Sequence, residues 1–218
     1  MAYKAAFFAS GRGSNFLAVL KHMQDGTLAV EPAFFLSNNS TSQSIQTARE
    51  NNIPAYHVST RTEGSEEGVE KKILELVDVH APDLLVLGGY MRKVPLKVIR
   101  SLPNRIINIH PALLPSFGGS GWYGGRVHEG VINKGCQYSG VTIHVVNEVY
   151  DEGTIIMQRA TEVIPGETAE ELAARVLKIE HDCLWRVVKG YAEGILRPAD
   201  DGLEGIDAFR RNLLNSEF

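Results

Sequence analysis

Asn108 and His110 are the two side chains whose types and spacing best suit chemistry on an oxygen atom. They lie two residues apart at the end of the apolar run 106–109, within the segment NIHPALLP at 108–115. On a β-strand, residues i and i+2 point to the same face, so one pocket could receive both side chains. An amide and an imidazole can both donate hydrogen bonds to an oxygen that gains negative charge. The pair therefore predicts an oxyanion-stabilising site; the alternative is a strand end with a buried, hydrogen-bonded histidine.

An isolated acid, Asp151, follows in the segment EVYDEG at 148–153. Near His110, a carboxylate would orient the imidazole, raise its pKa and favour its protonated form. If Asp151 lies beside it, we therefore expect a protonated His110. An aspartate is also common in a turn between two strands, and spacing alone does not show that it reaches His110. His144, two residues after Thr142 in a strand pattern, is a further residue for the same face.

A second motif, SGRGSN at residues 10–15, follows the first apolar run. Strand, glycine-rich turn and helix open many α/β units that bind phosphate, because backbone N–H groups at a helix N-terminus attract anions. The motif is not a Walker loop, since no Gly-Lys-Ser/Thr follows, and it lacks the third glycine of the dinucleotide fingerprint. The alternative is a tight turn capped by Ser14 or Asn15.

The elements that must position these residues follow from apolar periodicity. Short apolar runs predict strands at 3–8, 30–36, 55–58, 83–88 and 106–109, and helical patterns lie between several of them. After the glycine-rich loop 116–125, we expect a short helix at 126–133, a hairpin of 138–146 with 154–163, and a long helix at 168–194 that begins with the N-cap Thr168. This order predicts an α/β fold: a mostly parallel twisted sheet with helices on both faces and antiparallel strands toward the C-terminal half. We predict one domain at 1–197 and a tail or surface helix at 198–218.

Composition narrows the functional classes. The 218 residues are 44% hydrophobic, and 22 Lys and Arg against 26 Asp and Glu give a net charge of −4, so neither nucleic acid nor a membrane is an expected partner. Cys136 and Cys183 are expected to be reduced thiols in a cytoplasmic protein. No spacing of His, Cys or acids suggests a metal site. We keep a homodimer open, because the sequence does not set the oligomeric state.

Several motifs in order resemble one enzyme family. They are SGRGSN at 10–15, GYMR at 89–92, NIHPALLP at 108–115, GVTIHVV at 140–146, Asp151 with Gly153, and Glu180 with His181. The chain resembles the folate-dependent phosphoribosylglycinamide formyltransferases of purine biosynthesis, from about residue 3 to about residue 196. The resemblance implies a Rossmann-like formyltransferase fold. It also implies transfer of the formyl group of 10-formyltetrahydrofolate, as cosubstrate and without a metal, to the amine of glycinamide ribonucleotide.

The resemblance also implies roles for individual residues. Asn108, His110 and Asp151 would be catalytic: the first two would stabilise a tetrahedral intermediate, and Asp151 would assist proton transfer. Glycinamide ribonucleotide would be held by four residues: Gly13, Ser14, Asn15 and Glu180. The folate site would be lined by Met91, Arg92, Lys93, Val94, Leu87, Ile99, Ile106, Asn147 and Glu148.

Two positions depart from the family pattern. Glu66 stands near where a basic residue often assists the phosphate, and Leu177 stands where a polar or basic residue is common. Two alternatives to formyl transfer stay open. In a formyltetrahydrofolate hydrolase, water replaces the amine; the N-terminal regulatory domain of those enzymes is not expected here, because the first strand begins at residue 3. In a non-catalytic module that binds a phosphate ligand, His110 and Asp151 would not matter.

Overall fold

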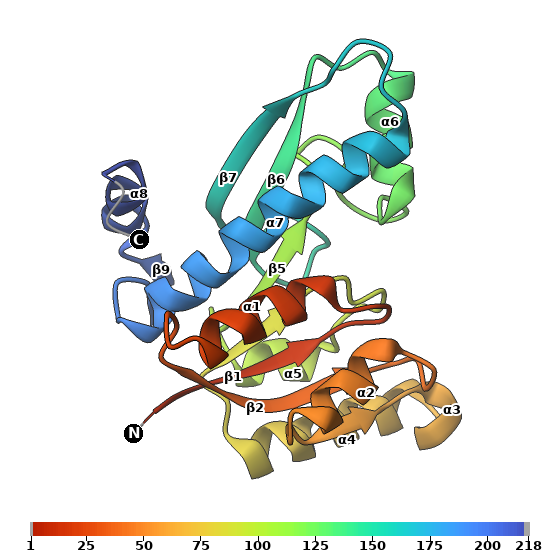
Figure 1. The fold of residues 1–218 in the computed structure, drawn as a ribbon. Coiled ribbons are helices and arrows are strands. Elements are labelled where there is room, and N and C mark those ends of the chain that lie inside the picture. The colour runs from red at the N-terminus through yellow and green to blue at the C-terminus, as the bar shows by residue number, and fades with distance from the viewer. Residues whose placement is uncertain (1, 216–218) are drawn as a thin grey trace. The chain divides into compact units, whose positions relative to one another are not determined.

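The computed structural model describes residues 2–215, and the chain divides into two compact units, 1–107 and 108–218. The strands of the first unit are β1 (Tyr3–Phe8), β2 (Val30–Ser37), β3 (Ala55–His57) and β4 (Leu84–Leu87). Its helices are α1 (Ser14–Gln24), α2 (Gln43–Glu50), α3 (Thr60–Glu63), α4 (Glu66–His80) and α5 (Leu96–Ser101). β1 pairs in parallel with β2 and β4, and β2 pairs in parallel with β3. Figure 1 shows the alternation of these strands and helices.

Aromatic side chains of β1 and β2 show how helices cover this part of the sheet. Successive residues of a strand point to opposite faces. On one face, Phe16 of α1 packs against Phe7 and Phe35, with ring centroids 5.2 and 4.7 Å apart. On the other face, the ring of His80 at the end of α4 lies 5.2 Å from that of Phe34. The predicted cover of helices on both faces is therefore confirmed for this unit.

The second unit is built on a long hairpin. β6 (Tyr138–Val145) and β7 (Ile155–Glu162) pair in antiparallel fashion, and α7 (Ala169–Ala192) runs along them (Figure 1). The other elements are α6 (Gly125–Asn133), β8 (Arg197–Ala199), β9 (Gly202–Glu204) and α8 (Ile206–Leu214). The predicted N-cap Thr168 begins α7, where its side chain accepts the N–H of Glu171 and the side chain of Glu171 accepts the N–H of Thr168.

Strand order confirms the predicted fold class. The sheet runs β3-β2-β1-β4-β5-β6-β7, and its strand β5 (Ile106–His110) carries the predicted Asn108 and His110. Parallel pairing in the first unit gives way to the antiparallel hairpin in the second. The predicted domain boundary at residue 197 stays a prediction.

Most of the expected tail is ordered chain that packs on α7. Phe209 of α8 is fully buried, and a Cβ at Gly190 would lie only 2.8 Å from its ring. Arg210 donates hydrogen bonds to the carbonyls of Ile155 and Ile156, at 2.8 and 3.0 Å, and so attaches α8 to β7. We infer that α8 stabilises the second unit through apolar burial and through these charged hydrogen bonds.

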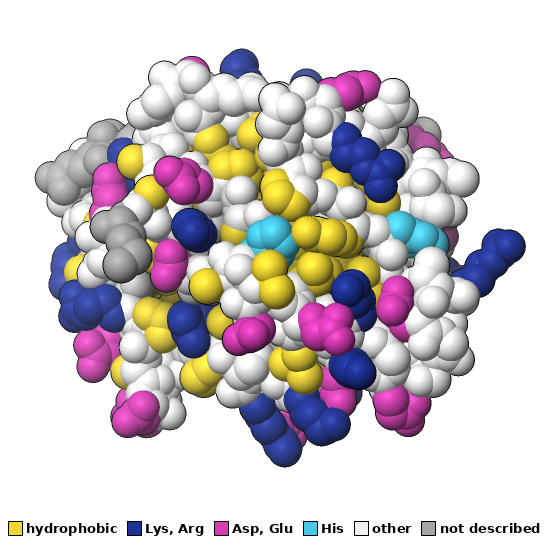
Figure 2. All heavy atoms as spheres, turned by 90° about the horizontal axis from the view of Figure 1, so that it is seen from below, with side chains coloured by type: hydrophobic (Ala, Val, Ile, Leu, Met, Phe, Trp, Pro, Cys, Tyr) yellow, Lys and Arg dark blue, Asp and Glu magenta, His cyan; other side chains and the backbone are white. Residues whose placement is uncertain are grey.

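On the face shown in Figure 2, side chains of one charge do not form a continuous patch. Basic and acidic side chains alternate there with apolar ones, apart from the grey atoms. Such a surface produces no strong single-sign field to steer a highly charged polymer. Among the described residues, no helix is long and apolar enough to span a bilayer.

Candidate active site

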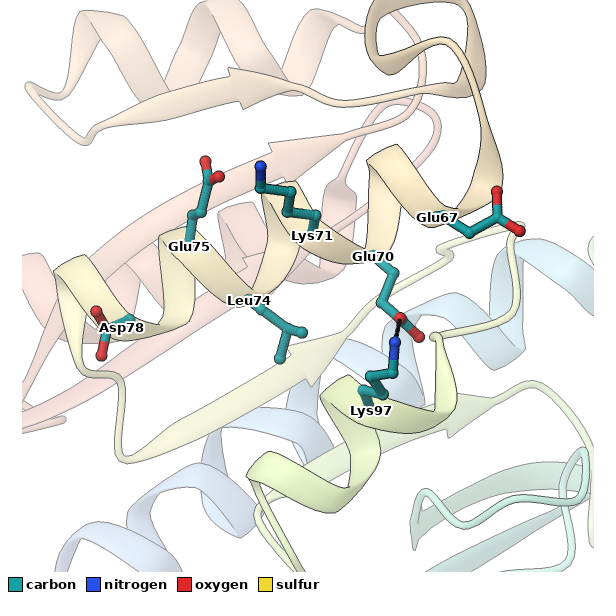
Figure 3. A pocket seen from close by; sticks show the side chains of 7 residues that line it. All are labelled: Glu67, Glu70, Lys71, Leu74, Glu75, Asp78 and Lys97. Atoms are coloured by element: carbon teal, nitrogen blue, oxygen red, sulfur yellow. Dashed lines mark hydrogen bonds and ion pairs between the residues drawn. The ribbon is translucent and has the colours of Figure 1, made fainter.

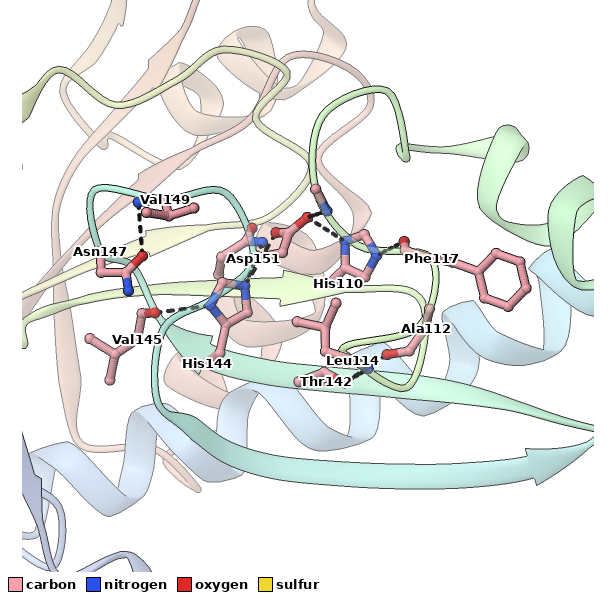
Figure 4. A network of polar contacts seen from close by, with 12 residues as sticks. His110, Ala112, Leu114, Phe117, Thr142, His144, Val145, Asn147, Val149 and Asp151 are labelled. Carbon is pink, nitrogen blue, oxygen red and sulfur yellow. Dashed lines mark hydrogen bonds and ion pairs between the residues drawn. The ribbon is translucent and has the colours of Figure 1, made fainter.

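His110 is the last residue of β5, and its side chain is buried. Its Nε2 lies 2.7 Å from the carbonyl oxygen of Phe117, and its Nδ1 lies 3.7 Å from Oδ2 of Asp151 (Figure 4). Because a carbonyl oxygen can only accept, Nε2 carries a hydrogen and donates it to Phe117. The imidazole therefore presents one nitrogen to a carboxylate and the other to a loop carbonyl.

Asp151 is positioned by the glycine-rich loop 116–125. Its Oδ2 accepts the backbone N–H of Gly119 at 2.9 Å. Gly118 passes so close that a Cβ there would lie 3.3 Å from the Cβ of Asp151 and 2.5 Å from Leu114 Cδ2. Asp151 has a φ of +57°, in the left-handed region that aspartate tolerates better than most residues. The loop 116–125, which was predicted only from its glycines, thus packs closely around Asp151.

His144 of β6 is the third polar side chain of this cluster. Its Nδ1 lies 2.9 Å from the carbonyl of Val145, which accepts its hydrogen. Its Nε2 lies 3.1 Å from Nδ2 of Asn108, which therefore donates to it, and 3.5 Å from Oδ1 of Asp151. The spacing from Thr142 had placed His144 on the expected face but had given it no role.

Asn108 and His110, two residues apart, both reach this one cluster. Asn108 contacts His144, His144 lies beside Asp151, and Asp151 lies beside His110. The amide nitrogen of Asn108 has two hydrogens, and His144 takes one of them. The second hydrogen of that amide can serve a ligand.

Burial decides the charge of His110. It lowers the pKa of His110, and the charge of Asp151 and the carbonyl of Phe117 oppose it only in part, so the net pKa lies below the ordinary value of 6.5. This lowered pKa favours the neutral imidazole at neutral pH, against the expectation of a protonated His110. Burial alone would raise the pKa of Asp151, but the neighbouring His144, the charge of His110 and the N–H of Gly119 lower it below its ordinary value. The site combines a neutral imidazole with an ionised carboxylate.

Stability should fall on mild acidification. Burial is the largest cause of a lowered pKa at several histidines, namely His80, His110, His128 and His181. The unfolded chain then binds these protons at a higher pH than the folded chain, so stability rises with pH through the window just below pH 6.5. We expect urea unfolding to give a smaller free energy at about pH 5.5 than at about pH 7.5.

A variant at His128 tests the cause of this pH dependence. His128 on α6 is 5% exposed, and its buried Nδ1 has no hydrogen-bond partner among the described residues. His128→Gln removes one of the titrating groups, and so the stability of this variant should depend less steeply on pH. An unchanged slope would show that His128 does not contribute.

The turn that follows His110 is held from β6 and β7. Thr142 Oγ1 donates to the carbonyl of Ala112 at 2.7 Å and accepts the N–H of Leu114 at 3.0 Å. Gln158 Nε2 donates to the carbonyl of Leu114 at 2.9 Å and to Thr142 Oγ1 at 3.0 Å. Because the turn begins next to His110, these bonds fix the backbone that follows the imidazole. Sequence spacing did not single out Gln158.

In the first unit, residues 10–15 form the predicted turn between β1 and α1, here called the phosphate loop. Gly13 is the N-cap of α1, with a φ of +67°, and no side chain caps this helix. The alternative in which Ser14 or Asn15 caps the helix is therefore wrong. Ser42 and Ser44 each donate a hydroxyl hydrogen bond of 2.8 Å to the carbonyl of Gly11. These two serines fix the backbone of the loop from the side of α2.

Gly13→Ala should damage this loop. A Cβ at Gly13 would lie 2.5 Å from the Cβ of Ser44, and the positive φ disfavours any L side chain. We expect urea unfolding to show a loss larger than the ~1–2 kcal/mol of left-handed strain alone. Gly26→Ala is the matched control, because Gly26 has a φ of +80° with no atom within 4 Å of a Cβ. Equal losses in the two variants would contradict the predicted clash with Ser44.

Some of the residues expected to bind folate are buried, and the others are exposed. Leu87 and Ile106 are buried in strands, Val94 is 3% exposed, and Met91 is 50% exposed beside Arg92 and Lys93 in the stretch 91–94, here called the folate segment. Ile99 is buried in α5. In the second unit, Asn147 and Glu148 are exposed in the loop between β6 and β7. The exposed members can contact a ligand from solvent, whereas Leu87 and Ile106 can act only through the strands they belong to.

Three residues singled out in the sequence remain: Glu180, Glu66 and Leu177. Glu180 is 8% exposed on α7 of the second unit. Glu66, the first departure from the family pattern, is in the first turn of α4, where the helix dipole favours an acid. Leu177, the second, is half-buried on α7. Packing and helix position therefore account for both departures without a ligand.

A groove of about 510 Å³ lies along α4 and α5 of the first unit (Figure 3), and none of its lining residues is a histidine. Its lining is Glu67, Glu70, Lys71, Leu74, Glu75, Asp78 and Lys97. Lys97 crosses it to form a 2.6 Å ion pair with Glu70. The lining has four acids against two lysines, so the groove disfavours an anionic substrate.

The fold and the cluster together define a class of protein. An amide, two imidazoles and a carboxylate meet around a strand end of an α/β sheet, as an enzyme that stabilises a developing oxyanion and moves a proton requires. Among the described residues, no group of three or more His, Cys, Asp or Glu is arranged to hold a metal ion.

Comparison with known proteins identifies the family. The "Formyl transferase" family model matches residues 3–188. The chain is 40% identical to the chloroplastic phosphoribosylglycinamide formyltransferase of Arabidopsis thaliana over 92% of this chain and 69% of that protein. It is 32% identical to the Bacillus subtilis phosphoribosylglycinamide formyltransferase over 85% of this chain and 93% of that protein.

A solved structure agrees with these relatives. The crystal structure of glycinamide ribonucleotide transformylase 1 from Symbiobacterium toebii matches with a TM-score of 0.85 and 30% identity, over 93% of each chain. This chain belongs to the formyl transferase family, within its phosphoribosylglycinamide formyltransferase branch.

Proposed function

We propose that this chain transfers the formyl group of 10-formyltetrahydrofolate to the amine of glycinamide ribonucleotide in purine biosynthesis. The observation that carries the proposal is the cluster of Asn108, His144, Asp151 and His110 at the end of β5. Family membership supports formyl transfer, and the names of the relatives support the acceptor. The proposed function names the reaction that the oxyanion site predicted from the spacing of Asn108 and His110 would serve.

The first step creates the negative charge that this cluster would stabilise. The amine attacks the formyl carbon, a C–N bond forms, and the formyl oxygen becomes an oxyanion. The free amide hydrogen of Asn108 donates to that oxygen. The Nε2 hydrogen of His110 donates as well, once it turns from the carbonyl of Phe117 to the substrate. A neutral imidazole suffices for this role, because donation needs a hydrogen and not a charge.

The second step moves one proton. The attacking nitrogen becomes positively charged and passes a proton to the carboxylate of Asp151, directly or through water. Asp151 then delivers this proton to N10 of the folate, the bond from carbon to N10 breaks, and tetrahydrofolate leaves. The lowered pKa of Asp151 supports this role, since the acid begins the cycle ionised. His144 orients both Asn108 and Asp151.

Binding roles follow the same proposal. Gly13, Ser14 and Asn15 of the phosphate loop would hold the substrate phosphate, because the N-terminus of α1 begins there without a side-chain cap. Glu180 would hold the ribose or the amine end. The folate would be bound by the folate segment, with Asn147 and Glu148 of the second unit.

One assay separates formyl transfer from the alternatives. The protein is mixed with 10-formyltetrahydrofolate, with or without glycinamide ribonucleotide, and the folate absorbance is followed. Deformylation that depends on the ribonucleotide supports transfer. Deformylation without it would support the hydrolase, and no deformylation in either mixture would leave a binding module and contradict the proposed function.

We propose the cytoplasm as the compartment of this enzyme. Cys136 and Cys183 are free thiols, as a reducing environment favours. A fluorescent fusion with a compartment marker tests this proposal. The homodimer stays a prediction, which light scattering of the purified protein would decide.

A further inference from the structure

Ser10 uses all of its polar groups to join three strand ends of the first unit. Its backbone N–H donates to the carbonyl of Gly89 at 3.0 Å. Its hydroxyl accepts the N–H of Met91 at 2.7 Å and donates to Oδ1 of Asn38 at 2.5 Å. Its carbonyl accepts from Nδ2 of Asn39 at 3.4 Å. The hydroxyl is therefore a bridge from the end of β1 to the chain that follows β4 and to the chain that follows β2.

This bridge connects two segments with separate proposed ligands. Ser10 is the first residue of the phosphate loop, and Met91 is the first residue of the folate segment. A second contact lies beside it: a Cβ at Gly88 would be 3.0 Å from the Cβ of Asn15. The ring of Tyr90 also packs edge-on against Phe8 of β1, with centroids 5.3 Å apart. The chain at 88–91 thus rests directly on the chain that begins the phosphate loop.

We propose that Ser10 is a positioning residue that fixes the folate segment relative to the phosphate loop, so that each substrate affects the binding of the other. The inference rests on the proposed function of these two segments. Only a hydroxyl can both accept from Met91 and donate to Asn38 at these distances. Without it, both partners must find water, and the backbone at 91 loses the bond that sets its position.

The test measures substrate binding as well as turnover. In Ser10→Ala, we expect the KM values for 10-formyltetrahydrofolate and glycinamide ribonucleotide to rise about 5- to 50-fold, with kcat changed by less than about threefold. Ser10→Thr keeps the hydroxyl and should recover most of the loss. Ser101→Ala is the control, because among the described residues its hydroxyl bonds only within α5, to the carbonyl of Val98 at 2.9 Å.

Calorimetry measures the coupling itself. Glycinamide ribonucleotide is titrated alone and with saturating tetrahydrofolate, which cannot transfer a formyl group. In the wild-type protein, we expect the two dissociation constants to differ by about fivefold or more. In Ser10→Ala, their ratio should approach one, and Asn38→Ala, which removes one partner of the hydroxyl, should reduce it in part.

The outcomes separate this inference from the proposed function. Wild-type protein that shows no ribonucleotide-dependent deformylation would overturn the proposed function, and the inference with it. An active wild type with unchanged KM values and unchanged coupling in Ser10→Ala would overturn the inference alone. If Ser10→Ala does not fold, Asn38→Ala and Ser10→Thr decide in its place: wild-type coupling in Asn38→Ala, or loss of coupling in Ser10→Thr, would contradict it.

Discussion

Asp151→Asn should lower kcat by about 10²–10⁴-fold, the range that one positioned acid or base contributes. The amide cannot take the proton from the attacking amine, whereas its shape still suits the site. Asparagine also tolerates the left-handed backbone at this position, where φ is +57°, and its oxygen can still accept the N–H of Gly119. Steady-state kinetics should therefore show the loss in kcat with little change in KM.

Two further measurements isolate the role of Asp151. The pKa of His110 should fall further in Asp151→Asn, because the carboxylate is the largest influence that opposes the effect of burial. An NMR titration of the imidazole measures this change. Glu152→Gln is the matched control, since it removes the neighbouring exposed carboxylate and leaves Asp151 in place. Near-normal kcat in Asp151→Asn, or an equal loss in Glu152→Gln, would argue against proton transfer by Asp151.

Asn108→Ala should lower kcat by about 10²–10³-fold, as removal of one oxyanion donor does. His144 takes only one of the two amide hydrogens of Asn108, whereas the Nε2 hydrogen of His110 is already bonded to the carbonyl of Phe117. Because the bond to the oxyanion forms only in the transition state, kcat and kcat/KM should fall together. Single-turnover kinetics measure the chemical step directly.

A variant of His144 controls for the hydrogen bond that Asn108 makes within the protein. His144→Gln keeps an oxygen that can accept from Asn108, so the orientation of that amide should be largely retained. We expect a clearly smaller loss of kcat in His144→Gln than in Asn108→Ala. A loss as large as that of Asn108→Ala would mean that Asn108 acts by supporting His144 rather than by contacting the substrate.

Local pattern was sufficient to predict most of the fold. Apolar runs predicted the parallel strands, and Thr168 predicted the start of α7, because strand period and helix capping depend on neighbours in sequence. The same logic placed Asn108 and His110 on one face of β5. It gave no role to His144 or Gly119, since a strand histidine and a loop glycine look alike whether or not they contact an acid.

The protonation of His110 could not be predicted from the sequence pattern. The family resemblance, and not spacing, indicated a carboxylate partner, and Asp151 does lie beside the imidazole and raises its pKa. The net shift is nevertheless downward, because burial of the ring outweighs that partner. Burial is set by every segment that packs around a residue, and no pattern of nearby sequence measures it.

By itself, the amino-acid sequence determined the α/β class, the order of the elements, the pairing of Asn108 with His110 and the family resemblance, because each depends on residue types at short or ordered spacings. Only the tertiary structure decided that Phe117 takes the hydrogen of His110, and that Ser10 joins the phosphate loop to the folate segment. The first contact joins residues seven positions apart and the second joins residues 81 positions apart, and in both the partner is chosen by packing and hydrogen-bond geometry.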